Sequence, residues 1–299
     1  MKQIFLDGNS LTLGQLEDIS LQKATVSLTE TAKKKVNKAR DFVEKIVAED
    51  RVVYGITTGF GKFSDVKISP EDLQVLQENL ILSHATGVGE PFSEAETRAI
   101  MVLRANVLAK GHSGIRLSTL ETLLAMLNKG VHPIIPQQGS VGASGDLAPL
   151  SHLALVLLGH GEAIFQGERM DGKTAMEKAN ISLIRLEAKE GLALNNGTQV
   201  MTGVGALAWS KAFRLCQLAD VVGALSLEAL AGTPKAFDAK VHNVRMHKGQ
   251  MASAQNLRHL LEDSLIRQSH LACEKVQDAY SLRCMPQVHG AARQALEFA

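Results

Sequence analysis

The sequence has few aromatic residues and no excess of charge of one sign. Only 4% of its 299 residues are aromatic, among them 2 tyrosines and 1 tryptophan, so stacking platforms for nucleobases are not expected. Lys+Arg number 32 and Asp+Glu 31, which gives a formal net charge of +1. This balance gives no electrostatic support to a surface that binds nucleic acid or an anionic membrane. We therefore predict neither nucleic acid nor membrane as a partner.

Cysteine is also scarce. Cys216, Cys273 and Cys284 are the 3 cysteines of the chain, and an odd number cannot form a complete disulfide framework. They lie in no CxxC or Cys/His pattern with zinc-ligand spacing, so we predict no metal site. Reduced thiols are typical of the cytoplasm, and the N-terminus lacks the basic and apolar regions of a signal peptide. The most apolar stretches are too short or too interrupted by charge to span a bilayer, so we predict a cytoplasmic protein.

Helical patterns dominate a composition that is 45% hydrophobic and 21% charged, as in globular proteins. Cap signatures predict helix starts at Ser27 with Glu30, at Ser69 with Pro70, and at Ser93 with Glu96. Apolar periodicity predicts further helices over residues 118–129, with Gly130 as the stop, and 147–158. Strand patterns are few and short, at residues 3–6, 163–170 and, more weakly, 181–186.

A long apolar segment changes the organisation of the chain after Thr198. It continues without proline to about Ala231, which predicts a helix about 50 Å long at 1.5 Å per residue. A helix that is apolar on most faces must be buried, so we expect a bundle with other long helices, from other subunits. Residues 251–268 predict a second bundle helix. We place a boundary near residue 200, with an N-terminal domain over 1–200 and the first part of a bundle over 201–299. Residues 290–299 resemble the opening of another helix, so we expect a chain that is truncated at its C-terminus.

Two formal matches to phosphate-binding motifs fail on their context. Gly203-Val-Gly205-Ala-Leu-Ala208 fits GxGxxA but lies inside a helical pattern, which favours close helix packing. Residues 167–174 fit GxxxxGK[ST], but Glu168 and Asp171 would repel phosphates, which favours a hairpin turn. We predict no dissociable cofactor.

The stretch that carries chemistry is Gly139-Ser-Val-Gly-Ala-Ser-Gly145, which we call the tripeptide loop after its Ala143-Ser144-Gly145. Six of its seven residues are small, and a helix that begins near Asp146 follows directly. Taken alone, this pattern suits either a tight turn that leads into a buried helix or an anion site at a helix N-terminus.

Residues 139–150, Gly-Ser-Val-Gly-Ala-Ser-Gly-Asp-Leu-Ala-Pro-Leu, strongly resemble the active-site signature of the histidine and aromatic amino acid ammonia-lyases. The resemblance implies that Ala143-Ser144-Gly145 cyclises autocatalytically into a methylidene-imidazolone electrophile. The residue types suit this closure, because the Gly145 nitrogen must reach the Ala143 carbonyl carbon and bulky side chains would obstruct it. Loss of the Ser144 hydroxyl then leaves a methylidene group. Asp146 is implied to assist the proton transfers of cyclisation.

Four further segments resemble the family in order along the chain. Residues 54–61 resemble its tyrosine loop, residues 83–87 its substrate-selecting segment, residues 195–198 its asparagine loop, and residues 277–287 a loop that supplies glutamine, tyrosine and arginine. The resemblance implies two catalytic tyrosines, Tyr54, which is the base, and Tyr280. It also implies four substrate-binding residues, His84, Asn196, Gln277 and Arg283.

Each of these residues also has a plain structural interpretation. Tyr54 alone would usually be a packed ring, His84 a helix cap and Arg283 a surface charge. We interpret His152 as a structural histidine of a buried helix. Phenols ordinarily titrate near pH 10, which makes tyrosine a poor base at neutral pH. The resemblance implies that a set of helix N-termini makes a tyrosine base possible, because their positive ends favour phenolate and a developing carbanion.

The resemblance implies a mainly α fold, with a mixed N-terminal domain of few short strands and a long-helix bundle, similar to the fumarase/aspartase-like ammonia-lyases. It also implies a homotetramer. Ser83-His84 resembles the residue pair of the histidine-specific branch, in which the imidazole of the enzyme can hydrogen-bond the imidazole of the substrate. We therefore predict elimination of ammonia from L-histidine to give trans-urocanate. The alternatives are a catalytically incomplete fragment that only folds or assembles, because the family continues beyond residue 299 to a functional glutamate, and an aromatic amino acid lyase or aminomutase.

Overall fold

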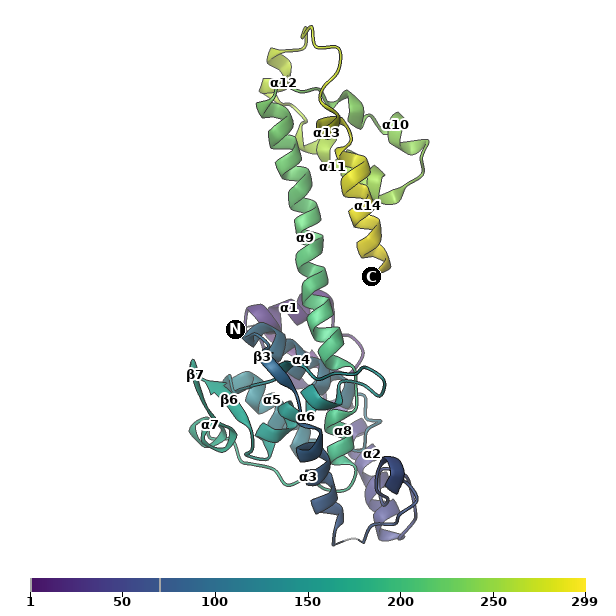
Figure 1. Ribbon diagram of the computed structural model, residues 1–299, viewed down its shortest axis with the longest axis vertical. Coiled ribbons are helices and arrows are strands. Elements are labelled where there is room, and N and C mark those ends of the chain that lie inside the picture. Colours follow the sequence, from purple (N-terminus) through teal and green to yellow (C-terminus); the bar gives the residue numbers. More distant parts are fainter. Residues whose placement is uncertain (1, 70) are drawn as a thin grey trace. The chain divides into compact units, whose positions relative to one another are not determined.

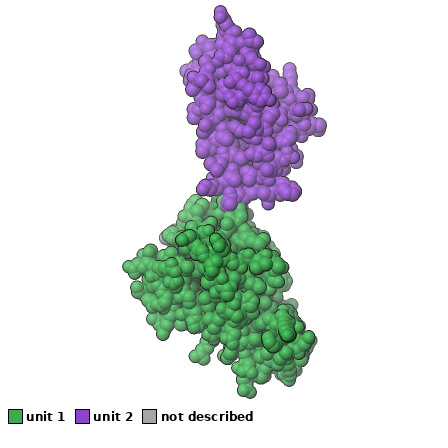
Figure 2. Space-filling view, viewed as in Figure 1, with its two compact units in different colours: residues 1–207 green, residues 208–299 purple. Residues whose placement is uncertain are grey.

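The computed structural model describes residues 2–69 and 71–299, so Pro70, the expected first residue of a helix, lies outside the described residues. The chain divides into two compact units, Met1–Leu207 and Ala208–Ala299 (Figure 2). The division falls inside one continuous helix, α9 (Gln199–Ala229). The predicted boundary at residue 200 would place almost the whole of this helix in the second part, and that domain assignment stays a prediction.

Short strands form three small sheets in the first unit. β1 (Gln3–Leu6) runs parallel to β2 (Thr25–Leu28), and β3 (Val88–Pro91) runs antiparallel to β5 (Pro136–Gln138). The third sheet has the antiparallel order β4 (His132–Pro133), β6 (Glu162–Phe165), β7 (Glu168–Asp171). The predicted strand at 3–6 and hairpin at 163–170 are confirmed.

The predicted strand over 181–186 is wrong. Ile181 and Leu186 are buried, but the segment has no neighbouring strand. Its backbone is held by single hydrogen bonds, such as Ile184 N–H to the Leu157 carbonyl at 3.0 Å. The apolar residues therefore anchor a connecting segment to the core and do not form a ladder.

Helices make up most of the first unit (Figure 1). They are α1 (Leu13–Leu21), α2 (Glu30–Ala48), α3 (Leu73–His84), α4 (Glu94–Leu108), α5 (Leu117–Lys129), α6 (Leu147–Leu157), α7 (Gly172–Lys178), α8 (Glu190–Asn195), the first turns of α9 and the 3₁₀ turn η1 (Gly61–Phe63).

Some of the predicted caps agree with the observed helix ends and others do not. Ser93 and Glu96 form a complete capping box at the start of α4, and Gly130 ends α5 at φ 78°, as predicted. The predicted cap at Ser27 is wrong, because Ser27 lies in β2 and Thr29 caps α2. The start predicted at Ser69 is displaced to Asp72, since Ser69 forms a turn ahead of α3.

The core of the first unit is built around α4 and α6. α4 buries residues on nearly every face, including Ile100, Met101 and Leu108, and α1 and α5 pack against it. α6 is buried from Ala148 to Leu157 and packs against α3 and α8. Gly203 of α9 lies so close to α4 that an added Cβ would sit 3.3 Å from the Ile100 nitrogen. This contact supports the packing interpretation of Gly203.

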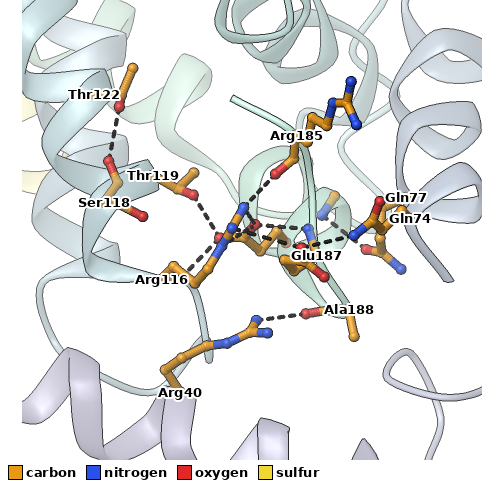
Figure 3. Close-up of polar contacts among 12 residues, drawn as sticks. Arg40, Gln74, Gln77, Arg116, Ser118, Thr119, Thr122, Arg185, Glu187 and Ala188 are labelled. Carbon is orange, nitrogen blue, oxygen red and sulfur yellow. Dashed lines mark hydrogen bonds and ion pairs between the residues drawn. The ribbon is translucent and has the colours of Figure 1, made fainter. Parts of the chain in front are cut away.

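A buried ion pair fixes the segment that leads into α8. The Glu190 side chain, 0% exposed, accepts hydrogen bonds from the Arg116 guanidinium (2.6 and 3.0 Å) and backbone N–H (3.0 Å), and from Thr119 Oγ1 (2.7 Å) and the Glu187 N–H (2.9 Å). Figure 3 shows Arg116, Thr119 and Glu187 converging on this point. Every lone pair of the carboxylate is thus directed at a donor, as a buried charge requires.

The second unit is helical in its described part. Besides the rest of α9 it contains η2 (Pro234–Phe237), α10 (Ala239–Asn243), α11 (Lys248–Leu260), α12 (Leu265–Ser269), α13 (Tyr280–Arg283) and α14 (Met285–Phe298). α11 packs closely on α14, since a Cβ on Gly249 would lie 2.3 Å from the Gly290 carbonyl oxygen. Among residues 2–69 and 71–299, no helix is long and apolar enough to cross a membrane.

The predicted continuous helix over 251–268 is wrong. α11 ends at Leu260, and the chain turns through Asp263 at φ 58° before Ser264 caps α12. Asp and Ser bond to nearby backbone groups and favour such breaks over helix interiors.

Removing the Glu190 charge should destabilise the first unit. Glu190→Gln keeps the size of the side chain but turns an NH₂ toward donors and leaves the Arg116 guanidinium without its carboxylate. The free energy of unfolding should therefore fall by about 3 kcal/mol. Urea unfolding followed by circular dichroism measures this. Glu162→Gln, in the exposed pair with Arg169, is the matched control and should leave the midpoint nearly unchanged. Equal midpoints for the two variants would contradict the assignment.

Candidate active site

The buried carboxylate of Asp146 connects the tripeptide loop to α9. Its Oδ1 accepts a hydrogen bond from Ser140 Oγ at 2.6 Å, and its Oδ2 accepts the N–H groups of Val200 and Met201 at 2.9 and 3.0 Å. α6 begins at the next residue, Leu147. The N-terminal ends of α6 and α9 therefore meet at this carboxylate, and their positive dipole ends favour negative charge there.

The asparagine loop (residues 195–198) is bonded to the same place. The Asp146 N–H donates to the Gly197 carbonyl oxygen at 2.6 Å. Gly145 has φ +104°, and a Cβ added to it would lie 2.5 Å from the same oxygen. Only glycine fits both this conformation and this approach, so the tripeptide and asparagine loops form one compact unit.

The tripeptide itself is presented on the surface of this frame. Ala143 and Ser144 are exposed, whereas Gly145 and Asp146 are buried. Gly142 at φ +74° and Gly145 at φ +104° bend the chain on either side of Ala143-Ser144. The arrangement leaves the Ser144 hydroxyl accessible and holds the nitrogen that would close the ring.

The Ser-His segment (residues 83–87) contacts the start of the tripeptide loop. β3, which follows it, pairs with β5 just before Gly139, and a Cβ on Gly139 would lie 3.0 Å from the Gly87 Cα. The Gly87 N–H donates to His152 Nε2 at 3.0 Å. Burial lowers the pKa of His152, which favours the neutral ring that this bond needs. The structural role expected of His152 is thus to fasten this segment to α6.

The tyrosine loop (residues 54–61) is held by its threonines and leaves its tyrosine exposed. Thr57 Oγ1 donates to the Arg51 carbonyl at 2.5 Å, and Thr58 Oγ1 to the Gly59 carbonyl at 3.0 Å. Tyr54 is 57% exposed and meets the Phe60 ring edge-to-face at 6.4 Å between centroids. A Cβ on Gly55 would lie 3.0 Å from Leu192 of α8, so the loop packs beside the helix that ends at the asparagine loop.

His84 lies on a cavity of about 310 Å³ that the tyrosine loop also lines, through Gly59 and Phe60. It is the last residue of α3, and its Nδ1 is 2.8 Å from the Leu80 carbonyl oxygen. Because a carbonyl only accepts hydrogen bonds, Nδ1 carries a proton, and in the neutral ring Nε2 is then an acceptor. The helix-cap interpretation of His84 and a role for Nε2 in binding are therefore compatible.

The two asparagines of the asparagine loop have different surroundings. Asn195 is completely buried, and its Nδ2 donates to Ser151 Oγ at 3.2 Å. Asn196 is exposed at the C-terminal end of α8. Of the two side chains, that of Asn196 is the one accessible to a small molecule.

The second unit carries the remaining predicted site residues, Gln277, Tyr280 and Arg283. Gln277 and Tyr280 are exposed, and the Arg283 guanidinium lies 5.4 Å from the Tyr280 ring centroid. Arg283 Nε donates to the Asp278 carbonyl at 3.0 Å. A hydrogen bond with the Cys284 thiol raises the pKa of Tyr280.

No metal cluster accompanies these groups in the described part of the chain, where no three His, Cys, Asp or Glu side chains gather as ligands would. The frame does suit an internally formed electrophile. It holds small residues at 143–145, a buried nitrogen at Gly145 that abuts Gly197, and a carboxylate at Asp146 next to the loop.

Sequence reasoning missed several residues of this frame. They are Ser140, Gln199 and Arg104. The signal for Arg104 was its place among Met101, Val102 and Ala105, which the structure buries. A charged residue in such surroundings needs buried partners.

Comparisons with known proteins identify the family of this chain. The aromatic amino acid lyase family model matches residues 11–299. A histidine ammonia-lyase of Alkaliphilus oremlandii is 55% identical over 300 residues, which cover 100% of this chain and 59% of that relative.

Solved structures give the same picture of the fold. A histidine ammonia-lyase from Trypanosoma cruzi matches with a TM-score of 0.89 and 43% identity, over 99% of this chain and 55% of that chain. A tyrosine aminomutase from Streptomyces globisporus matches with a TM-score of 0.91 and 38% identity, over 99% and 59%. This chain thus spans less than two thirds of the length of these relatives. The predicted helical ammonia-lyase fold is confirmed, and the chain belongs to the aromatic amino acid lyase family.

Proposed function

We propose that this chain provides the electrophile-forming part of an ammonia-lyase that converts L-histidine to trans-urocanate and ammonia. The observation that carries the proposal is the joining of the tripeptide and asparagine loops at Asp146. The naming of several relatives at 53–55% identity as histidine ammonia-lyases supports the choice of substrate.

The electrophile would arise from the chain itself. The Gly145 nitrogen attacks the Ala143 carbonyl carbon, and the new C–N bond closes a five-membered ring. The carbonyl oxygen leaves as water with the N–H hydrogens of Gly145 and Ser144, and a C=N bond forms between the Ala143 carbon and the Ser144 nitrogen. Ser144 then loses its hydroxyl and its α-hydrogen as a second water, which leaves the methylidene-imidazolone. In this proposal Asp146 moves protons in these steps, and Ser140 and two backbone N–H groups fix its carboxylate. No dissociable cofactor is part of the proposal.

The methylidene-imidazolone supplies an electron-poor alkene that withdraws electrons from the bound substrate. Tyr54 takes a β-proton of the substrate, and ammonia leaves from the neighbouring carbon. The positive ends of α6 and α9 favour the negative charge that develops. Asn196, Gln277 and Arg283 bind the substrate, with Arg283 suited to bind its carboxylate, and Tyr280 is the second catalytic tyrosine.

Selection of histidine would depend on His84. Its Nε2 accepts a hydrogen bond from the imidazole N–H of the substrate, while Nδ1 stays bonded to the Leu80 carbonyl. A phenyl ring offers no N–H, so binding it would leave a buried acceptor unpaired, and such sites discriminate well. An aromatic amino acid lyase or aminomutase is the competing assignment, since the fold also matches a tyrosine aminomutase.

Assembly into a homotetramer is the further part of the proposal. α9 exposes Leu215, Leu218, Val222 and Leu225, whose 3-4-3 spacing places them on one face of the helix. An apolar stripe of this kind is buried against other long helices when subunits associate. Three free cysteines in the described residues, Cys216, Cys273 and Cys284, support a cytoplasmic location.

Ring formation should be visible in the intact mass. The wild-type chain should weigh about 36 Da less than its sequence, the mass of two waters, whereas Ser144→Ala cannot lose the side-chain hydroxyl and should lack this deficit. Ser151→Ala is the matched control, because Ser151 is a buried serine bonded to Asn195 outside the tripeptide. A wild-type chain of unmodified mass would contradict the proposed electrophile.

Turnover of histidine should depend on His84 more than folding does. His84→Leu removes the hydrogen-bond partner of the substrate ring, which should cost about 1–3 kcal/mol, or about ten- to more than a hundredfold in kcat/KM. Urocanate absorbance measures the loss, and phenylalanine and tyrosine are tested in parallel because the apolar pocket should accept them better.

The exposed His160, paired with Glu78, provides the control His160→Leu, which should retain turnover. Equal kcat/KM for His84→Leu and the parent would remove His84 from substrate recognition. A cyclised chain that forms no urocanate would favour the assembly-only alternative, and β-amino acid products would identify an aminomutase.

The stripe on α9 should determine the oligomeric state. The 32.2 kDa chain should sediment as a tetramer, and Leu218→Lys with Leu225→Lys should shift it to smaller species because charges would be buried in the interface. Val244→Lys, at an exposed apolar residue outside the stripe, should leave the assembly intact. A monodisperse wild-type monomer in sedimentation velocity would count against the tetramer.

A further inference from the structure

Arg104 is a buried cation that the mechanism above does not use. It lies in the middle of α4 and is 2% exposed. Its guanidinium donates to the Gln199 side-chain oxygen at 2.5 Å and to the Ala193 carbonyl, and its Nε has no partner. Among residues 2–69 and 71–299, no carboxylate forms an ion pair with it.

The absence of a counter-charge makes this arginine costly to bury. Burial lowers the pKa of Arg104 to about 10, and its positive charge contributes to lowering the pKa of the neighbouring Lys189. A buried charge is normally paired or replaced by an apolar side chain. An arginine that binds two neutral oxygens at this buried position therefore needs an explanation other than stability.

Those two oxygens bracket the asparagine loop. Ala193 is in the last turns of α8, and Gln199 is the first residue of α9. Between them, Gly197 approaches the guanidinium so closely that an added Cβ would lie 2.1 Å from Arg104 Nη1. On its other side, the Gly197 carbonyl accepts the Asp146 N–H at 2.6 Å and abuts Gly145. Gly197 is thus enclosed between Arg104 and the residues that would form the ring.

We propose that Arg104 is a positioning residue for ring closure, which acts by fixing Gly197 against Gly145 and Asp146. A planar guanidinium can span two acceptors on different helices with fixed geometry, which lysine or an apolar residue cannot do. With α8 and α9 joined in this way, the Gly197 backbone holds Gly145 in its left-handed conformation. The inference rests on the proposed cyclisation.

Arg98 gives an unusually close control, because it is a second buried arginine on α4. It is 3% exposed and donates to the Ile19 and Leu127 carbonyls at 2.9 and 2.8 Å, all remote from the asparagine loop in sequence. Arg98→Met removes at least as many buried hydrogen bonds as Arg104→Met. A general loss of stability would therefore slow cyclisation in both variants.

The experiment follows the mass deficit of about 36 Da over time after a short pulse of expression, in the folded fraction of each protein. Arg104→Met should cyclise at least about tenfold more slowly than wild type, since small displacements of reacting groups have effects of this size. Arg98→Met should stay within about threefold of wild type. Arg104→Lys, which keeps the charge but reaches one acceptor, should fall between wild type and Arg104→Met.

If Arg104→Met does not fold, Gln199→Met tests the same connection, because it removes one of the two acceptors and leaves the arginine in place. Its cyclisation should also be slowed. Cyclisation of Arg104→Met at the wild-type rate would overturn the inference, and so would cyclisation of Gln199→Met at that rate where Arg104→Met is insoluble. Equal slowing in Arg98→Met would also overturn it. A wild-type chain that never loses the two waters would overturn the proposed function and this inference together, whereas a cyclised wild type with unaffected variants would overturn this inference alone.

Discussion

The hydrogen bonds of the Asp146 carboxylate and backbone hold the candidate site together. The carboxylate binds Ser140 of the tripeptide loop and the first N–H groups of α9, and the Asp146 N–H binds Gly197. Two regions that are far apart in the sequence, the tripeptide loop with the start of α6 and the asparagine loop with the start of α9, are thereby joined at one residue. Because the N-terminal ends of two helices meet there, this carboxylate is stabilised where an isolated buried charge would be costly. The rest of the first unit can be understood as the support for this junction.

That support includes buried charged side chains that bind the ends of helices. Glu190 binds Arg116 and fixes the start of α8, and Arg104 binds carbonyl groups at the end of α8 and the start of α9. Arg98 does the same for α1 and α5. Each of these side chains is directional, so it determines how one helix end is placed relative to another, which apolar packing alone does less strictly. The Glu190 and Arg104 interactions place both ends of α8, and with them the loop that touches Gly145.

Much of this architecture follows from local sequence signals. The capping box at Ser93, the glycine stop at Gly130 and the long apolar run of α9 each depend on residues close in sequence, and these predictions are confirmed. Two of the failures have a common cause. Ser27 fits a capping box but is drawn into β2 by pairing with β1, and residues 181–186 look like a strand but find no partner. Strand pairing is a long-range property that a local pattern does not contain. The same applies to the site, since motif resemblance selects Tyr54, His84, Ser144 and Asn196, whereas the contacts of Arg104, Gln199 and His152 with these segments emerge only from the fold.

The distribution of rigidity within the site has a chemical consequence. Gly145 and Asp146 are buried and bonded on several sides, while Ala143 and Ser144, which directly precede them, are exposed. The proposed ring closure would need the Gly145 nitrogen fixed and the Ala143 carbonyl free to approach it, because a chain that is rigid at both ends could not shorten the distance between them. Departure of two waters also needs access to solvent at Ser144. A frame that is rigid on the Gly145 side and open on the Ala143 side meets both needs, and it does so with glycines at 142 and 145 whose positive φ angles other residues would adopt only with strain.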